Sequence, residues 1–415
     1  MPRAQVSLIR HRPPRIERGH PWVYRTEIAR IDGDPAPGDD VLVVDADGRR
    51  LGTGYYNPAS MIAVRLFARG SAAPPPDLWR ARIAEARARR DTLLPGQTAY
   101  RAVNAEGDDL PGLIVDRFGD HLVVESLSLG VEVRLSAVVD ALRAVYAPRT
   151  VYLRADAAVR RLEGLDDNSR PLFGGEPPDE IEIDEDGVRF GVDIRSGQKT
   201  GHFFDQRPNR KEAGQLLAGA GEVLDAFCHT GGFGLQALAA GARHVTFVDS
   251  SAPALERARQ NARMNGFEDR CAFVLGNAFD VLRTWAQEGR IVDGVVLDPP
   301  AFAKAKAALD AALRGYNEIN LRAIRLVATG GYLVSASCSQ PVTREAFVDV
   351  IARAAGDNRR SMRLIALRGP GPDHPALLAE PQGDYLKCAF LEAGDGWSGF
   401  ATRPARPLAN PVAPS

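Results

Sequence analysis

The stretch EVLDAFCHTGGFGLQALAAGARHVTFVDSS, residues 222–251, decides the fold. Its apolar run at 223–227 is typical of a buried parallel strand, and a glycine cluster follows it directly. We expect a helix over 235–240 and a second strand over 244–248 that leads to Asp249. Strand, glycine turn, helix, strand and terminal acid form the βαβ unit with which α/β proteins bind nucleotides.

The spacing of the glycines bears on the ligand. A dinucleotide site would have G-x-G-x-x-G, so that a pyrophosphate rests on the helix N-terminus. Here Gly231, Gly232 and Gly234 read G-G-x-G, with Asp225 in the preceding strand and Phe227 just after it. An acid there would repel a pyrophosphate, whereas it could hold the amino group of a methionine moiety. The pattern favours S-adenosylmethionine over NAD, and a glycine-rich connection without a ligand is the remaining interpretation.

The alternation of strands and helices continues to residue 339. Further strands are expected at 271–275, 292–297 and 331–339. Open α/β sheets bind ligands beyond the carboxyl ends of their strands. Polar or reactive side chains fall at those ends, namely Asp225, Asp249, Asn277, Asp298 and Cys338. We therefore expect one site at this edge of the sheet.

Length and composition bound the remaining possibilities. The chain of 415 residues is long enough for two or three domains, and its 52 basic and 53 acidic residues nearly cancel. The four cysteines are scattered, with no C-x-x-C pair and no histidine at ligand spacing, which argues against a metal site and against disulfides. No apolar run reaches the length of a membrane span. We expect a soluble cytoplasmic protein with no membrane partner.

Residues 1–72 predict a small β-barrel, because short strand-like runs at 40–44 and 61–67 alternate with turn signals. The first 30 residues hold seven arginines and two glutamates. These arginines could pair with phosphates while aromatic rings stack on bases, and the rings are Trp22, Tyr24, Tyr55 and Tyr56. A solvated basic surface explains the pattern equally well.

The prolines at 74–76 separate this barrel from an α+β domain at 73–180, which we expect to position the substrate. Its acids Glu106, Asp108 and Asp109 are predicted to lie in a solvated loop. Residues 181–400 form the nucleotide-binding domain, which opens with a hairpin around Asp186-Gly187. The proline-rich tail, 401–415, is expected to be flexible.

Three segments of the last domain could take part in chemistry. The stretch 195–210 is polar and charged yet carries paired phenylalanines, which favours a site loop over a plain connector. Asp298 is followed by two prolines that hold its carboxylate on a rigid turn. Cys338, flanked by two serines, could act as a nucleophile, although an inert buried cysteine is the equally common alternative. Cys228, in the glycine turn, is a weaker candidate.

Four motifs in order, GQKTGHFFDQR (197–207), DAFCHTGGFG (225–234), LDPPAF (297–302) and SCS (337–339), resemble the bacterial 23S rRNA cytosine-5 methyltransferase I family. The resemblance spans nearly the whole chain, since the N-terminal barrel is similar to a PUA RNA-binding module. It implies a class I methyltransferase sheet, S-adenosylmethionine as cofactor, and 23S rRNA or a large-subunit precursor as partner. A homodimer is a further expectation that the residues do not decide.

The resemblance also implies roles for individual residues. Cys338 would attack carbon 6 of a flipped cytosine, and Asp298 would hold N3 and the exocyclic amine. The implied cofactor-binding residues are Lys199, Phe203, Gln206, Arg207, Asp225, Phe227, Gly231, Gly232, Gly234, Asp249, Ser250, Asn277, Ala278 and Asp298. Many RNA cytosine-5 methyltransferases carry a second cysteine beside the Asp-Pro turn, where this chain has Pro299-Pro300. The residue that removes the carbon-5 proton is therefore not identified, and His229 and Lys304 are the candidates.

Two other functions fit the same motifs. Asp-Pro-Pro followed by an aromatic residue also resembles the loop of enzymes that methylate exocyclic amines, for which Cys338 would be dispensable. An RNA-binding assembly factor that keeps the fold without turnover is the alternative outside enzymology.

Overall fold

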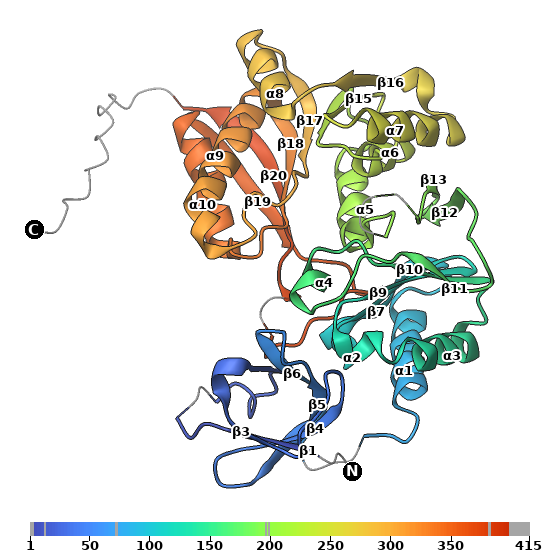
Figure 1. Ribbon diagram of the computed structural model, residues 1–415. Coiled ribbons are helices and arrows are strands. Elements are labelled where there is room, and N and C mark those ends of the chain that lie inside the picture. Colours follow the sequence, from blue (N-terminus) through green and yellow to red (C-terminus); the bar gives the residue numbers. More distant parts are fainter. Residues whose placement is uncertain are drawn as a thin grey trace, which may run out of the picture.

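The structure is a computed structural model that describes residues 4–11, 14–70, 74–195, 197, 200–380 and 383–397. Three sheets and a hairpin follow one another along the chain (Figure 1). None of the helices in these ranges is long and apolar enough to cross a membrane.

The N-terminal sheet has six strands in the order β2-β6-β5-β4-β1-β3. Their bounds are β1 Ala4–Leu8, β2 Trp22–Tyr24, β3 Ile28–Asp32, β4 Asp40–Val44, β5 Arg50–Tyr56 and β6 Ile62–Arg69, with a 3-10 turn η1 at Arg25–Glu27. Alternate residues of β1 are buried, so the sheet has one apolar face, as a period-two pattern requires. Valines and leucines such as Val6, Val43 and Leu66 fill its core.

The aromatic side chains of this sheet differ from the sequence prediction. Tyr55 is buried and stacks between Phe67, at 4.5 Å, and Trp79, at 6.1 Å between ring centroids. The indole N–H of Trp22 donates a 2.8 Å hydrogen bond to Glu106 in the next domain. The ring of Tyr55 is therefore packed against Trp79 of the middle domain and cannot stack on bases.

The middle domain is a five-stranded sheet in the order β11-β10-β9-β8-β7. The strands are β7 Ala99–Asn104, β8 Leu113–Phe118, β9 His121–Ser126, β10 Thr150–Arg154 and β11 Arg170–Phe173. The helices are α1 Leu78–Leu93, α2 Leu129–Glu132, α3 Leu135–Tyr146 and α4 Val159–Leu162. A 3-10 turn, η2, covers Ala105–Asp108. Asp77 caps α1 as its sequence position predicts, by accepting the N–H of Arg80. Apolar residues of α1 and α3, such as Ile83 and Val138, pack in the core of this sheet.

The acidic loop of the middle domain is not solvated, and that prediction was wrong. Asp108 is buried and forms two hydrogen bonds with the guanidinium of Arg90, at 2.6 and 2.7 Å. Glu106 pairs with Arg65 of β6 at 3.3 Å, and Asp109 pairs with Arg69 at 2.6 Å. Glu106 and Asp109 join the middle domain to the N-terminal one, whereas Asp108 pairs with Arg90 inside the middle domain. The local sequence encodes neither kind of contact.

A second buried carboxylate, Glu163, reinforces this junction. It accepts hydrogen bonds from Arg65 at 3.0 Å, Ser60 at 2.6 Å and Asn57 at 2.9 Å, all from the N-terminal domain. Burial raises the pKa of Glu163, but Arg65 and these hydrogen bonds outweigh it, so its pKa lies below the usual range. The ionised form is therefore the one that holds the two domains together.

We expect Glu163→Gln to lower the free energy of unfolding of the N-terminal pair of domains by about 3 kcal/mol, because it leaves the buried Arg65 without its full partner. Urea denaturation followed by Trp fluorescence measures this. Asp47→Asn is the matched control, since its ion pair with Arg10 is exposed and contributes less than about 1 kcal/mol. Below a pH of about 4.5 the wild type should lose the same contribution as Glu163 becomes protonated. Equal effects of the two substitutions would contradict the assignment.

The C-terminal domain contains a seven-stranded sheet in the order β16-β15-β14-β17-β18-β20-β19. The strands are β14 Glu222–Ala226, β15 His244–Asp249, β16 Cys271–Leu275, β17 Val292–Leu297, β18 Val327–Ser337, β19 Arg360–Arg368 and β20 Lys387–Gly396. The first five are parallel to their neighbours, and β20 is antiparallel to both β18 and β19. The strand order reverses between β14 and β17, which is where a doubly wound sheet opens a crevice.

Helices cover both faces of this sheet (Figure 1). They are α5 Arg207–Leu216, α6 Gly232–Ala239, α7 Ala252–Met264, α8 Ala278–Gln287, α9 Leu309–Leu326 and α10 Arg344–Asp357, with 3-10 turns η3 Phe204–Gln206, η4 Glu268–Arg270 and η5 Lys306–Ala308. Neighbouring residues of β14 point to opposite faces: Val223 packs with α6 and α7, and Leu224 with α8, α9 and α10. The predicted hairpin is present as β12 Ile181–Glu185 and β13 Val188–Val192.

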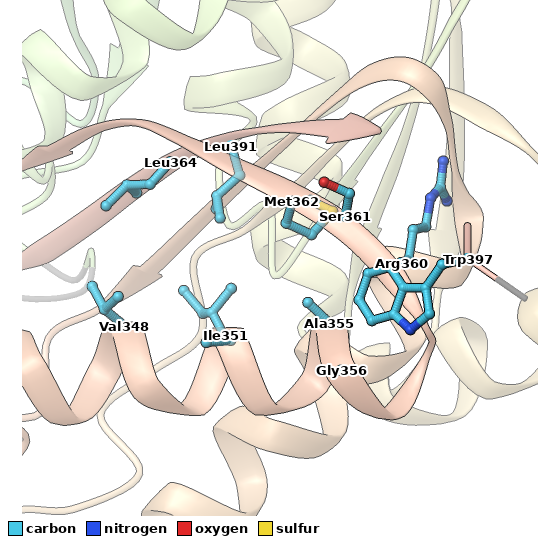
Figure 2. Close-up of a pocket in the computed structure, with 11 residues that line it drawn as sticks. Val348, Ile351, Ala355, Gly356, Arg360, Ser361, Met362, Leu364, Leu391 and Trp397 are labelled. Carbon is cyan, nitrogen blue, oxygen red and sulfur yellow. The ribbon is translucent and has the colours of Figure 1, made fainter. Parts of the chain in front are cut away.

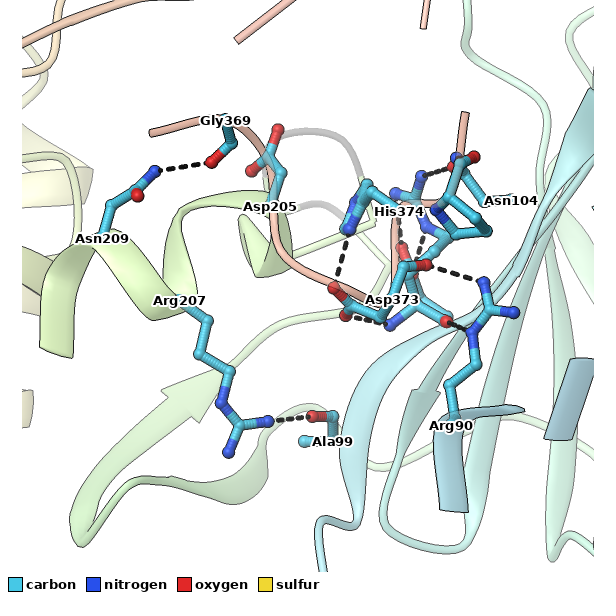
Figure 3. A network of polar contacts seen from close by, with 12 residues as sticks. Arg90, Ala99, Asn104, Asp205, Arg207, Asn209, Gly369, Asp373 and His374 are labelled. Atoms are coloured by element: carbon cyan, nitrogen blue, oxygen red, sulfur yellow. Dashed lines mark hydrogen bonds and ion pairs between the residues drawn. The ribbon is translucent and has the colours of Figure 1, made fainter. Parts of the chain in front are cut away.

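The connection from β19 to β20, described over 369–380 and 383–386, leaves the sheet and contacts the middle domain; we call it the return loop (Figure 3). The carbonyl of Asp373 accepts a bond from buried Arg90 at 2.7 Å, and its carboxylate accepts the N–H of Arg101 at 3.0 Å. Asn104 donates to the carbonyl of Pro375 at 3.0 Å. The return loop thus ties the last two strands to the middle domain.

Candidate functional site

A cavity of about 690 Å³ opens at the carboxyl ends of β14, β15, β17 and β18. Ten residues that the sequence analysis selected line it: Phe203, Gln206, Phe227, Gly232, Asp249, Ser250, Asn277, Ala278, Asp298 and Cys338. A smaller cavity of about 350 Å³ lies between α10 and the β19–β20 pair (Figure 2). Apolar residues such as Ile351, Met362 and Leu391 dominate that one. Convergent polar groups are found at the larger cavity, which is the candidate site.

The glycine turn that follows β14 borders the cavity on one side. Gly231 begins α6 with a φ of +88°, and Phe227 and His229 also have positive φ, at 63° and 49°. Non-glycine residues adopt this conformation at a cost, and such residues gather at functional sites. A Cβ on Gly232 would come within 2.6 Å of Cδ of Arg210, and one on Gly234 within 2.3 Å of the ring of Phe247. Gly232 therefore keeps space beside the cavity, whereas Gly231 and Gly234 serve the packing of the turn.

Asp225 lies behind the glycine turn and does not line the cavity. Its carboxylate is buried and accepts the N–H of Gly234 at 2.8 Å. Burial, together with the neighbouring carboxylates of Asp298 and Asp249, raises the pKa of Asp225 to about 7. The geometry gives Asp225 a direct role in holding the glycine turn.

Asp249 lines the cavity at the end of β15, and both of its oxygens accept backbone N–H groups at 2.8 Å, one from His229 and one from Ser251. Next to it, Asn277 caps α8 by accepting the N–H of Phe279 at 2.9 Å. Phe279 lies edge-on to Phe227 with ring centroids 6.0 Å apart. An acid beside an apolar slot of this kind suits a ribose and a purine base.

Asp298 is held by a chain of amides that the sequence analysis did not detect. Gln206 donates to Asp298 at 2.8 Å, and Asn209 donates to the carbonyl oxygen of Gln206 at 2.6 Å. Asn209 also donates to the carbonyl of Gly369 in the return loop at 3.2 Å (Figure 3). Because Asn209 occupies the Gln206 oxygen, the amide nitrogen of Gln206 faces the carboxylate of Asp298.

Arg210, and not the predicted Arg207, lies on the cavity wall. Its guanidinium forms hydrogen bonds at 2.6 and 2.5 Å with Glu185 of β12. Burial raises the pKa of Glu185, yet Arg210 and His202 outweigh this and hold it well below its usual range. Burial lowers the pKa of His202, although Glu185 opposes this, and the lowered pKa favours the neutral imidazole.

Arg207 of the predicted loop does not line the cavity. It bonds Asp186 of the β12–β13 hairpin at 3.1 Å and the carbonyl of Ala99, in the middle domain, at 3.4 Å (Figure 3). Lys199 lies outside the described residues. The local sequence of the loop did not distinguish Arg207 from Arg210, because the difference arises from the hairpin that packs against α5.

Cys338 lies just past β18 with its Sγ 3.9 Å from the carbonyl oxygen of Pro299, so it faces the Asp-Pro-Pro turn. Burial raises the pKa of the Cys228 and Cys388 thiols well above the usual range and that of Cys271 to about 12. A thiol held protonated is a poor nucleophile. Among the four cysteines, Cys338 therefore best fits a reactive role.

The proton-acceptor candidates differ in position. His229 lines the cavity, edge-on to Phe203 with centroids 5.1 Å apart. Lys304 is exposed in the loop after the Asp-Pro-Pro turn and does not line the cavity. No group of three or more potential metal ligands occurs in the described ranges.

The chain is similar to known proteins over nearly its full length. The family of PUA-like domains matches residues 6–69, and the S-adenosylmethionine-dependent methyltransferase family matches residues 146–376. Ribosomal RNA large subunit methyltransferase I of Aeromonas hydrophila is 40% identical over 395 residues, 94% of this chain and 99% of that protein. The protein of the same name from Photobacterium profundum is 40% identical and covers 92% and 97%.

Solved structures share the fold. A Streptococcus mutans protein described as a SAM-dependent methyltransferase superposes with a TM-score of 0.79 at 20% identity, covering 94% of this chain and 99% of that one. The structure of SMU.776, described as a methyltransferase complexed with SAH, gives a TM-score of 0.80 at 21% identity and covers 94% and 100%. The cavity fits such a cofactor, because Gly232 of the glycine turn lines it and Asp249 stands beside it at the end of β15.

The cofactor is S-adenosylmethionine, and the chain belongs to the ribosomal RNA large subunit methyltransferase I family.

Proposed function

We propose that this protein methylates carbon 5 of a cytosine in large-subunit ribosomal RNA through a covalent adduct with Cys338. The observation that carries the proposal is that Cys338 and Asp298 line the same cavity as the cofactor turn. The relatives' names supply the RNA substrate, and 23S rRNA or a precursor of the large subunit is the partner we infer. An rRNA substrate also fits a reaction in the cytoplasm.

The chemistry requires a nucleophile because carbon 5 of cytosine is not nucleophilic by itself. Cys338 adds as a thiolate to carbon 6, and the ring electrons move to carbon 5. S-adenosylmethionine supplies the methyl group that carbon 5 takes. Loss of the carbon-5 proton to a base then returns the electron pair to the ring, and the carbon–sulfur bond breaks to release Cys338.

Asp298 supports this addition. As a neutral carboxyl group it would donate its proton to N3 and accept from the exocyclic amine through its other oxygen, which makes carbon 6 of the flipped base more electrophilic. Gln206 and Asn209 keep that carboxyl group in one orientation before the base arrives. A preorganised group costs no reorganisation during the reaction, so the amide chain serves the same step.

The cofactor lies across the other wall in this proposal. Asp249 accepts the ribose hydroxyls, while Asn277 and Ala278 border the adenine slot. Gly232 and Arg210 border the methionine end, where the Arg210 guanidinium suits the carboxylate. A role for Lys199 as a cover stays a prediction, as do the domain limits at 72, 180 and 400 and a homodimer.

We expect Asp249→Asn to weaken S-adenosylmethionine binding about 10- to 100-fold, because a good charge-assisted pair of hydrogen bonds contributes about 1.5–3 kcal/mol. Isothermal titration calorimetry measures it. Asp293→Asn is a matched control: Asp293 likewise accepts two backbone N–H groups, from Gly221 and Glu222, but does not line the cavity. Weakening by both substitutions would show that the loss is structural.

A trapping experiment separates the proposed function from its alternatives. The protein, S-adenosylmethionine and rRNA containing 5-fluorocytidine are incubated and resolved on a denaturing gel. A stable adduct supports cytosine-5 chemistry, because fluorine at carbon 5 cannot leave as a proton does. Methylation of ordinary rRNA without an adduct would favour exocyclic-amine methylation, and RNA binding without methyl transfer would favour an assembly factor.

A further inference from the structure

Lysine is rare in this chain, and its placement is uneven. Of the 52 basic residues, five are lysines, at positions 199, 211, 304, 306 and 387. Lys387 has no exposed surface, unlike the exposed Lys211, Lys304 and Lys306. Nearly all positive charges of this chain are arginines, yet the fully buried position 387 holds a lysine, whose ammonium is compact and titratable.

Lys387 lies directly behind Cys338. It begins β20 and faces Ser337, the last residue of β18, in the antiparallel register. Its Nζ donates to the carbonyl of Ser339 and to that of Tyr385, both at 2.8 Å. Ser337 and Ser339 flank Cys338. By binding the carbonyl of Ser339, Lys387 therefore holds the backbone next to the Cys338 thiol. The next residue toward the N-terminus, Leu386, lines the cavity.

The charge of Lys387 is not neutralised by an ion pair in the described part of the chain, because no salt bridge there includes it. Asp384 is paired with Arg344 at 2.5 Å instead. Two carbonyl oxygens satisfy two donors of the ammonium but supply no formal negative charge. Asp384, although paired with Arg344, still attracts the ammonium, and a thiolate on Cys338 would add a second negative charge.

Electrostatics supports this coupling in both directions. The pKa of Lys387 is lowered to about 8, mainly by burial; Arg344 acts in the same direction, and Asp384 and Cys338 act against it. The attraction between two charges is reciprocal, so an ammonium that the thiolate stabilises also stabilises the thiolate. Other titratable groups face the pair as well: Tyr385, bonded to Asp205; Tyr316, bonded to Ser339; and Asp298 across the cavity.

We propose that Lys387 is a positioning residue that holds the Ser337–Ser339 turn and, as an ammonium, stabilises the thiolate of Cys338. This inference rests on the proposed role of Cys338 as nucleophile. It assigns a function to a residue that contributes no side-chain atoms to the described cavity wall. Lys387 acts through Cys338 and does not touch the base.

The test is the rate at which iodoacetamide alkylates Cys338 between pH 6 and 10, resolved from the other cysteines by peptide mass spectrometry. Lys387→Met should slow alkylation at pH 7 about tenfold and move the midpoint up by about one pH unit, the size of a single charge interaction beside a thiolate. Lys387→Arg keeps the positive charge, so at pH 7, where the wild-type ammonium is also present, its rate should stay near wild type. Lys211→Met, at an exposed lysine paired with Asp186, is the control.

An unchanged alkylation profile in Lys387→Met would overturn the inference. If that variant does not fold by circular dichroism, Lys387→Gln, which retains a donor for the carbonyls but no charge, takes its place with the same expectation. Alkylation is measured without RNA, so the two proposals fail separately. A lysine effect on the thiol without an RNA adduct would refute the cytosine-5 function alone, and an adduct that forms equally fast in the neutral variants would refute the lysine role alone.

Discussion

Cys338→Ala should abolish methyl transfer to rRNA, with a fall in turnover of at least about 10³-fold, because no other group can form the bond to carbon 6. Tritium transfer from labelled S-adenosylmethionine to rRNA measures the rate. The cofactor should still bind within about threefold of wild type, since Asp249, Asn277 and the glycine turn are untouched. Loss of chemistry with retained binding is the signature of a nucleophile.

Cys228→Ala provides the matched control. Cys228 lines the same cavity, yet burial holds its thiol protonated, and its Sγ contacts the carbonyl of His229 at 3.7 Å. Its removal should leave the rate within about threefold. Full activity in Cys338→Ala would shift the assignment to amine methylation, which needs no thiol.

Asp298→Asn should lower turnover by about 10²- to 10³-fold, the usual loss when one preorganised group is removed from a charged transition state. Asparagine has the same shape and its carbonyl oxygen can still accept from Gln206, so the cavity should keep its form. Single-turnover rates under saturating RNA isolate the chemical step.

The control for Asp298 is Asp280→Asn, at an exposed acid of α8 that pairs with Arg283. It changes the same charge on the same domain without touching the cavity and should keep the rate within about twofold. If Asp298→Asn changed KM alone, the carboxylate would serve binding, and its proposed action on carbon 6 would be wrong.

The elements of the nucleotide-binding domain could be predicted because their signals are local. Apolar runs such as 223–227 and 292–297 specify buried strands, and the acids after them necessarily meet at one edge of a parallel sheet. Asp249, Asn277, Asp298 and Cys338 line one cavity for that reason. The S-adenosylmethionine cofactor followed from the same turn and is confirmed by the family to which the chain belongs.

The remaining features depend on contacts between segments far apart in the sequence. Arg207 and Arg210 look alike locally, but the hairpin residue Asp186 holds Arg207 at the border with the middle domain, and Glu185 holds Arg210 at the cavity. The burial of Asp108 depends on Arg90, and that of Lys387 on the end of β18. Periodicity and spacing along one segment carry no information about such partners.

The return loop has a consequence for how the protein can be divided. A fragment that begins at residue 181 would contain every strand of the seven-stranded sheet, yet Asp373 and Pro375 would lose their partners Arg90, Arg101 and Asn104. Leu386 lies at the far end of that same loop, and Lys387 follows it beside the turn that carries Cys338. The seven-stranded sheet is therefore completed by a segment that is hydrogen-bonded to the preceding domain. Because Glu106 and Glu163 in turn bind Arg65 of the N-terminal domain, expression of fragments, domain grafting and circular permutation should keep all three domains together.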